Sequence, residues 1–454
     1  PYPLESPAKL LYPVLTPLRN RFSRRVVGGQ GFHYKKITAI NTDKVWGSVL
    51  EAGSATTGRN TPIKYSEVDV SKTWATYGME SWYTEEAQRG GLSSIVPGQV
   101  FDNVAFADLS CLQAAMLVEE WLDFGGNSTD LGSPGAATKT GITQAATTVG
   151  GLSASTNHYV HVSALTWQGW YQGAIGVQGG VGSPGESDTT EATIATTAGG
   201  NAGDESLTVG WTALRGAFAY NVYVGTTTGR ANANYVGTFT TNRAYIGSVP
   251  AATKPNVADQ TGNAADYDGV FYQATLSANG GYFRSLDNAA LTGDSRFGCA
   301  ELSTMFKAFW DGTGGNTAKT GPTCLCVHST ERDKIGTLVG GSTAPVMRIE
   351  GTAGDAAITA GVYIGDVLNP YMNERVPLMT YPWAVPGSIV ALGERLGAAY
   401  PNSNIGVNIE KMLAWDYQRE EFARVGRKTE FGVYARGGLA IRAPFTMGAI
   451  VNIG

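Results

Sequence analysis

The sequence predicts an α+β protein that carries an inserted all-β domain, and three observations support this prediction. Short β-type runs alternate with charged residues over residues 412–454, one long helical pattern covers residues 102–124, and the composition changes abruptly between residues 134 and 265. The 60 glycines, together with abundant Thr and Ala, indicate many turns and a β-rich architecture. With 454 residues, of which 43% are hydrophobic and 16% charged, the chain is long enough for two or three folded domains.

Charge and hydropathy disfavour several classes of protein. The net charge of -5 gives no overall basic signal for nucleic-acid binding. The sequence contains no run of 18 apolar residues, so we expect no membrane span. No signal peptide is visible at Pro1, and we interpret Pro1 as the start of a processed or trimmed chain. One residue between Cys324 and Cys326 is a poor spacing for zinc, so we expect these two, Cys111 and Cys299 to be buried free thiols in a reducing cytosol.

The N-terminal region is basic and contains many prolines. Five prolines within the first 17 residues predict an extended arm without a helix. We expect this arm, residues 1–36, either to be a solvated tail or to dock on neighbouring subunits close to a polyanion. The second interpretation makes six basic side chains candidate assembly or DNA-proximal contacts: Arg19, Arg21, Arg24, Arg25, Lys35 and Lys36.

Residues 102–124 form the best helix of the sequence. Asp102 is a plausible N-cap and Gly125-Gly126 a stop signal. Apolar side chains occupy most sides, which is typical of a helix buried from several directions, so we expect a central spine helix. Just before it, residues 37–82 predict a long two-stranded excursion with little core of its own, which needs a partner surface. The predicted core positions of the spine helix are Leu109, Leu112, Met116 and Trp121.

Residues 134–265 predict an all-β domain. Only six acidic and five basic residues occur among these 132 positions, and strand signals recur between Gly, Asn or Thr turns. The run LTVGW at residues 207–211, followed by GAFAYNVY at residues 216–223, resembles the core strands of a fibronectin type III or immunoglobulin-like sandwich. No Cys pair is present, so a disulfide-bonded immunoglobulin domain is excluded. We predict that Trp211, Tyr220 and Val222 belong to the core of this insert.

Residues 266–454 predict a compact α/β lobe together with the closing strands. Residues 301–310 place Leu302, Met305, Phe306 and Phe309 on one face of an amphipathic helix. A buried strand at residues 324–327 leads to Ser329, which predicts the start of another helix, and residues 387–392 predict a further strand. Such alternation of helices and strands is typical of an α/β unit.

The order of these parts resembles a known family. The opening motif LTPLRN at residues 15–20, the run DGVF at residues 268–271 with Leu286-Asp287, and the closing strands are similar to those of tailed-bacteriophage major capsid proteins with the Hong Kong 97-type fold. The resemblance covers residues 10–133 and 266–454. It lies in the order of the parts, since no single motif is diagnostic.

This resemblance implies a fold with an N-terminal arm, an extended β loop, a spine helix, peripheral strands and an axial α/β lobe, from which the immunoglobulin-like insert projects outward. It implies a major capsid protein that assembles into hexamers and pentamers of an icosahedral phage head around double-stranded DNA. The expected partners are further copies of the chain, with portal, scaffold or cement proteins and nonspecific contacts to packaged DNA. The expected location is the shell of a virion made in the host cytoplasm, without cofactor, metal or membrane partner.

The sequence contains no motif of a known catalytic class. It has no phosphate-binding G-x-x-x-x-G-K-[ST] loop and no G-x-S-x-G nucleophile elbow, so we do not expect an enzyme. His158 and His161 are three residues apart in a strand-like run and are expected to face opposite sides. The adjacent Glu119 and Glu120 are expected to lie in salt bridges or on a solvated face.

Two other functions stay open. One is a different virion or tail structural protein, which would form tubes or fibres in place of closed shells. The other is an extracellular adhesin or carbohydrate-binding protein, for which Trp167, Trp170 and Tyr171 could form a sugar platform. We interpret these three aromatic residues as core residues.

Overall fold

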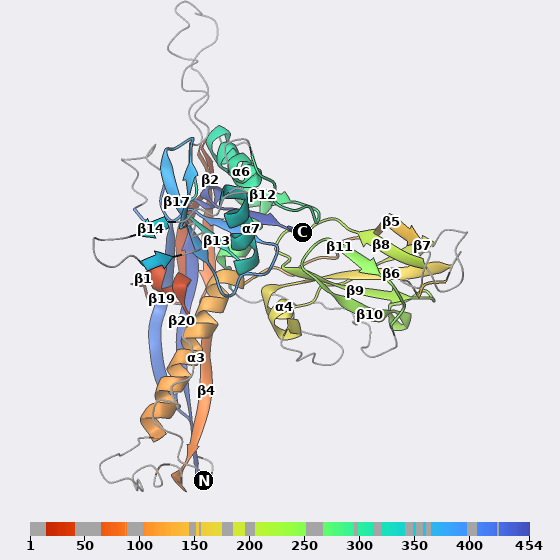
Figure 1. The fold of residues 1–454 in the computed structure, drawn as a ribbon. Helices are drawn as coiled ribbons and strands as arrows, with labels where there is room; N and C mark the ends of the chain where they lie inside the picture. Colours follow the sequence, from red (N-terminus) through yellow and green to blue (C-terminus); the bar gives the residue numbers. More distant parts are fainter. Residues whose placement is uncertain are drawn as a thin grey trace, which may run out of the picture.

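In the computed structural model, the described residues are 15–40, 65–86, 88, 103–144, 151–153, 156–174, 185–195, 205–250, 267–294, 298–312, 319–340, 348–350, 357–359, 365–396, 406–424 and 426–454. They form a mixed α/β molecule with three parts: a long stem, a lobe at one end of the stem, and a strand-rich insert that projects sideways (Figure 1). No helix within these ranges is long and apolar enough to cross a bilayer.

The stem is a four-stranded sheet with one long helix packed against it. The sheet has the order β1-β19-β20-β4, in which β1 is parallel to β19 and the other neighbours are antiparallel. Ala, Leu and Met, which have high helix propensity, fill the helix α3, and Cys111, Ala115, Phe431 and Val433 pack between α3 and the sheet. A helix is present where the sequence predicted one, although its predicted N-cap lies outside the described residues. The bounds are β1 Ser23–Val26, β4 Ala75–Thr84, α3 Asn103–Gly125, β19 Ile409–Glu421 and β20 Lys428–Ile441.

The arm departs from the prediction, because it contains a helix. Residues Pro17–Arg21 form the short helix α1. Pro17 lies in the first turn of α1, where backbone N–H groups have no partner within the helix. Proline therefore costs no helical hydrogen bond there, and its fixed φ suits a helix. The strand β1 follows α1 almost directly, so the described part of the arm packs on the stem of its own chain. The first 14 residues of the predicted arm lie outside the described residues.

The predicted two-stranded excursion is present but has different limits. The strands β2 (Gly31–Ile40) and β3 (Tyr65–Thr73) pair with each other in an antiparallel sheet of their own. The chain then passes through Trp74, which is buried against Phe32 with ring centroids 4.9 Å apart. The next strand, β4, pairs with β20, so residues 75–84 belong to the stem sheet and not to the excursion.

The lobe is built on a six-stranded mixed sheet of order β12-β21-β18-β13-β17-β16. The helix α6 buries Leu302, Met305, Phe306 and Phe309 in the core of the lobe, as its sequence pattern predicted. A separate small sheet pairs β14 with β15. The bounds are α5 Val270–Thr275, η3 Ser277–Asn279, β12 Tyr282–Ser285, α6 Ala300–Asp311, β13 Cys324–Val327, α7 Ser329–Gly340, β14 Arg348–Glu350, β15 Ala357–Thr359, β16 Asp366–Asn369, β17 Glu374–Thr380, β18 Ile389–Leu392, η4 Pro444–Thr446 and β21 Gly448–Val451.

Two sheets that share one apolar core make up the insert. One has the order β10-β9-β6-β7 and the other the order β11-β8-β5. The chain enters and leaves the insert side by side, because Gly269 donates its N–H to the carbonyl oxygen of Gly126 over 2.9 Å. The bounds are β5 Thr138–Gln144, β6 Asn157–Leu165, α4 Trp167–Ala174, β7 Thr190–Ala195, β8 Glu205–Gly210, β9 Ala219–Gly225, η2 Arg230–Asn232, β10 Asn234–Phe239 and β11 Arg243–Ile246.

The strand order of the insert differs from that of an immunoglobulin domain. In that fold strand C shares its sheet with strands F and G, which are the last two strands of the chain. Here β9 pairs with β6 and β6 pairs with β7, so the two strands in the equivalent positions precede β8 and β9 in the chain. The immunoglobulin-like assignment therefore stays a prediction and requires a permuted strand order. The predicted limits at residues 134 and 265 stay predictions as well, since residues 251–266 lie outside the described ranges.

Candidate assembly surfaces and the arm–spine network

A buried network of charges joins the arm, the spine helix and strand β19; we name it the arm–spine network. Lys411 of β19 donates a hydrogen bond of 2.6 Å to Asp123 Oδ1, and its Nζ lies 3.3 Å from Glu119 Oε1. Arg24 of β1 donates to Glu119 Oε1 over 2.6 Å, and Arg19 of α1 donates to Glu119 Oε2 over 3.0 Å. The side chains of Glu119, Asp123 and Lys411 are at most 1% exposed. Lys411 and Asp123, 288 positions apart in the chain, thus neutralise each other inside the stem.

The network sets the protonation of its two carboxyl groups differently. Burial would raise the pKa of Glu119, but the charges of Lys411 and Arg24 outweigh burial and lower this pKa to about 2. Burial raises the pKa of Asp123, and the charge of Glu119 adds to this effect while Lys411 opposes it. Tyr267 donates its hydroxyl proton to Asp123 and accepts a hydrogen bond from Lys411. The ionised form of Asp123 therefore depends on one cation, Lys411.

Glu120 holds the beginning of α1. Its Oε1 accepts the N–H of Leu18 over 3.0 Å, and its Oε2 accepts the N–H of Arg19 over 2.7 Å. These amides belong to the first turn of a helix, where no partner exists within the helix and a carboxylate is favourable. Burial nevertheless raises the pKa of Glu120 to about 7. Of the adjacent pair, Glu119 is salt-bridged as expected, whereas the expectation is wrong for Glu120, which is buried against arm backbone.

The six predicted assembly or DNA-proximal cations differ in their contacts. Five of them bond to residues of their own chain, and Arg25 is exposed. Arg25 lines a groove of about 420 Å³ with His33, Lys35 and Arg442. The role of the six cations at subunit contacts or near DNA stays a prediction. Five of them already have a partner within their own chain. The partners are Glu119 for Arg19, Glu394 for Arg21, Glu119 and Asp416 for Arg24, Glu67 for Lys35 and Asn279 for Lys36.

Of the four predicted core residues of the spine helix, Leu109 is contradicted, whereas Leu112 and Trp121 pack against apolar cores although they are only partly buried. Leu109 is 41% exposed, and Leu112, Met116 and Trp121 are only partly buried. The sheet covers α3 from one side, whereas the described residues leave the far side of its first half open. Leu109 is exposed on this side, and Met116, seven residues further along the same side of α3, is partly buried. The buried residues of α3 are instead Cys111, Ala115, Leu117, Glu119, Glu120, Asp123 and Phe124.

Four aromatic side chains join the insert to the stem and the lobe. Trp121 of α3 lies with its ring centroid 5.4 Å from Trp167 and 5.0 Å from Tyr171, both of α4, and 5.4 Å from Trp383 of the lobe. Trp167 and Tyr171 stack with an interplanar angle of 13°. Their ring faces are used within the chain, in agreement with the core interpretation and not with a sugar platform. Excision of the insert would remove two of these four rings.

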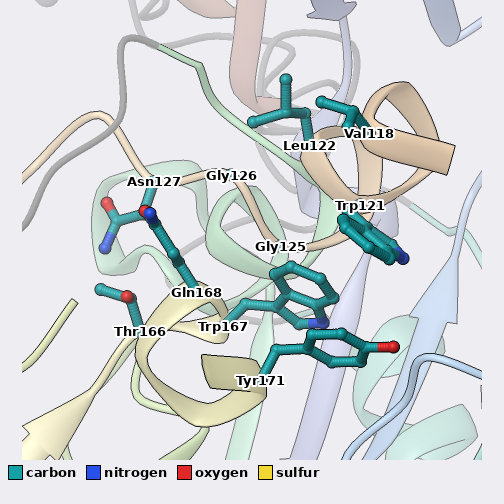
Figure 2. A pocket seen from close by; sticks show the side chains of 10 residues that line it. All are labelled: Val118, Trp121, Leu122, Gly125, Gly126, Asn127, Thr166, Trp167, Gln168 and Tyr171. Atoms are coloured by element: carbon teal, nitrogen blue, oxygen red, sulfur yellow. The ribbon is translucent and has the colours of Figure 1, made fainter. Parts of the chain in front are cut away.

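A cavity of about 270 Å³ lies beside this aromatic cluster, between the end of α3 and the beginning of α4 (Figure 2). Figure 2 shows Trp121 above the stacked rings of Trp167 and Tyr171, with Asn127 and Gln168 at the other end. Gly125 must lack a side chain, because a Cβ there would overlap Trp167. The cavity has a mainly apolar lining.

The predicted core residues of the insert are buried. Trp211, Tyr220 and Val222 are 5%, 1% and 0% exposed, and the ring centroids of Trp211 and Tyr220 lie 5.2 Å apart. The hydroxyl of Tyr220 accepts the N–H of Leu214 over 2.9 Å. Trp167 and Phe218 of the insert lie in the same apolar core as Phe124 of the stem. The insert thus has its own core and also completes that of the stem.

The described residues contain neither a disulfide nor a group of three or more His, Cys, Asp or Glu that could hold a metal ion. All four cysteines are buried and free, as expected. Sequence reasoning missed Lys411, although a signal was present. Ile409, Lys411 and Leu413 share one face of a strand, so a lysine occupies an inward position of an apolar pattern. Such a position demands a buried anionic partner.

Comparison with known proteins gives the following findings. No protein-family model matches the chain, and no curated protein matches it. Solved structures of assembled shells are similar to it along most of its length. The encapsulin complex SrpI from Synechococcus elongatus has 7% identity and a TM-score of 0.40, covering 96% of this chain and 88% of its own. The capsid of a native GTA particle has 8% identity and a TM-score of 0.41, with coverages of 100% and 95%. The capsid of Myoviridae phage XM1 has 12% identity and a TM-score of 0.39, with coverages of 97% and 92%.

Proposed function

We propose that this chain is a structural protein that assembles with further copies of itself into a closed shell. The finer form of the proposal is a major capsid protein of the Hong Kong 97 type, arranged in hexamers and pentamers around packaged DNA, with the insert projecting outward. The observation that carries the proposal is the shape of the stem. A long helix covers one face of a long sheet and leaves the apolar side chain of Leu109 41% exposed among the described residues.

The hairpin β2–β3 supports the same conclusion. It is a two-stranded sheet, and such a hairpin is marginally stable alone in water. Val68 on β3 is 48% exposed, and no other strand of the described residues pairs with the outer edge of β3, which could therefore pair with another chain. A second copy of the chain would cover both features. Heterologous contacts of this kind generate closed rings.

The chemistry of the stem also favours a structural role. Its buried charges form ion pairs and hydrogen bonds with one another, and these contacts hold the arm, α3 and β19 together. The pKa of Glu119 is lowered by that pairing, which keeps the carboxylate ionised and fully occupied. The proposal therefore contains no catalytic step.

The test is electron microscopy of the full chain after expression, with two matched variants. Leu109→Glu places a charge on α3 at an apolar side chain that is 41% exposed, and should leave the monomer folded while preventing shells. Tyr245→Glu makes the same kind of change at a 46% exposed residue of the insert and should leave the shells intact. Circular dichroism of both variants checks that each is folded.

Three results would count against the proposal. Tubes or fibres from the unaltered chain would favour another virion or tail component. A chain that stays monomeric at high concentration would remove the shell proposal. Normal shells from the Leu109→Glu variant would show that the open face of α3 is not a subunit contact.

A further inference from the structure

Lys411 and Asp123 of the arm–spine network are placed for a chemical reaction with each other as well as for an ion pair. Lys411 Nζ lies 2.6 Å from Asp123 Oδ1, which puts the nitrogen beside the carboxyl carbon Cγ to which that oxygen is bonded. Both side chains are 1% exposed, and Nζ lies 4.9 Å and 4.6 Å from the ring centroids of Tyr77 and Tyr267. An amine and a carboxyl group held in contact inside such a shell need no collision in order to react, and little water is present to reverse the reaction.

One oxygen of Asp123 lacks a partner. Oδ1 accepts hydrogen bonds from Lys411 Nζ and from the hydroxyl of Tyr267, whereas Oδ2 is buried and forms no hydrogen bond with any described residue. A buried carboxylate oxygen without a donor is costly, so the ionised form of Asp123 is poorly stabilised. Burial raises the pKa of Asp123 although the charge of Lys411 opposes this effect. The site therefore favours the protonated carboxyl group, which is the form that an amine attacks.

Glu119 supplies a proton acceptor beside the amine. Its Oε1 lies 3.3 Å from Lys411 Nζ, and its carboxylate also pairs with Arg19 and Arg24. Because these two cations remain, Glu119 stays paired when Lys411 loses its charge. A carboxylate in this position can accept a proton from the attacking nitrogen and pass it to the departing oxygen.

We propose that Lys411 and Asp123 of the same chain condense to form an amide bond between Nζ and Cγ. The bond between Cγ and Oδ2 breaks, and Oδ2 leaves as water with two of the three protons of the lysine ammonium group. The third proton stays on the amide nitrogen. The reaction uses no oxidant, cofactor or second molecule. Chain that has not condensed keeps the ion pair, and the two forms differ in mass by one water molecule.

The product would satisfy the polar atoms of this site better than the ion pair does. The unpartnered Oδ2 is gone, Oδ1 becomes the amide oxygen and keeps the hydroxyl of Tyr267 as its donor, and the amide N–H has Glu119 Oε1 as its acceptor. Two charges disappear from a site with almost no exposure, and burying charges costs more than burying a hydrogen-bonded amide. The bond would tie α3 to β19 across 288 positions, a span that contains the insert and most of the lobe. The stem would then hold together when either of these parts opens.

The test is the intact mass of the full chain, measured by mass spectrometry under denaturing conditions on fresh material and after prolonged incubation at neutral pH. The expected mass is that of the sequence minus one water molecule. A tryptic digest should contain one branched peptide that joins the segments around residues 123 and 411, without cleavage after Lys411. The Lys411→Met and Asp123→Ala chains should lack this peptide. Lys72→Met is the matched control and should keep it, because Lys72 pairs with Asp268 over 3.1 Å with a side chain that is 42% exposed.

Three results would overturn the proposal. The full mass of the sequence without a branched peptide, in both fresh and incubated chain, would show that the pair stays ionic. A deficit of one water located at Asp268-Gly269 or Asp311-Gly312 would be a ring closure of the backbone and not the proposed bond. A branched peptide that persists in the Asp123→Ala chain would assign the bond to another carboxyl group. Shell formation is scored separately, and the proposed bond lies within one chain, so its failure leaves the proposed function untouched.

Discussion

Replacing Lys411 by Met should destabilise the stem by leaving the carboxylate of Asp123 buried without a cation. Met keeps a similar volume and removes the charge. Lys411 Nζ lies 2.6 Å from Asp123 Oδ1 and 3.3 Å from Glu119 Oε1. Glu119 retains Arg19 and Arg24 after the substitution, whereas Asp123 retains only the hydroxyl of Tyr267 among the partners described above. The stranded charge is therefore that of Asp123.

The expected loss is large and depends on pH. Removing one partner of a buried ion pair costs about 3–5 kcal/mol, and the loss at pH 8 should lie within this range. Burial already raises the pKa of Asp123 in the unaltered protein, and the variant raises it further. A carboxyl group whose folded-state pKa is raised stabilises the fold most at low pH and loses this contribution as pH rises. The variant should therefore be closer in stability to the unaltered chain at pH 5 than at pH 8.

The assay is hydrogen exchange of the α3 amides in increasing urea at both pH values, with rates corrected for intrinsic exchange. This reports the opening free energy of the stem itself, since a chain with several domains has no single unfolding free energy. The double variant Lys411→Met/Asp123→Asn is the control and should recover most of the loss at pH 8, because no charge is left unpaired. A loss below about 1 kcal/mol for the single variant, or equal losses for the single and double variants, would refute this account of the network.

Three further predictions concern the arm and the insert. The raised pKa of Glu120, about 7 against 4.5, means that the folded stem loses stability as pH rises from about 5 to 8, by at most about 3 kcal/mol; Glu120→Gln should remove this dependence, and hydrogen exchange of the α3 amides measures it. Gly125→Ala should lower the midpoint of thermal unfolding, because the added methyl group overlaps Trp167, whereas Gly132→Ala, where the space is open, should not. Excision of residues 134–265 should leave a chain that folds but is less stable than the full chain, because the stem core loses Trp167 and Phe218, and an unchanged melting temperature would contradict that shared core.

Local patterns were sufficient to locate several elements. The spine helix and the helix at Ala300–Asp311 follow from apolar spacing that repeats within one or two turns, a property of consecutive residues alone. The insert followed from a change in composition and from the paired signals around Trp211 and Tyr220, both of which are buried. Its strand order did not follow, because hydrophobic alternation says which face of a strand is buried and not which strand lies beside it.

The tertiary structure alone decided which side of the spine helix is buried and what the arm charges do. Leu109 reads as a core residue from its helical position, yet it is exposed because the sheet covers the opposite side of α3. From the sequence, Arg24 belongs to a basic arm that could be solvated, and Lys411 lies in a strand without any sign of a partner. In the structure both form ion pairs with Glu119 inside the stem. Burial and ion pairing depend on which distant segments meet. The pairing of β1 with β19, almost 400 residues further along the chain, brings those segments together.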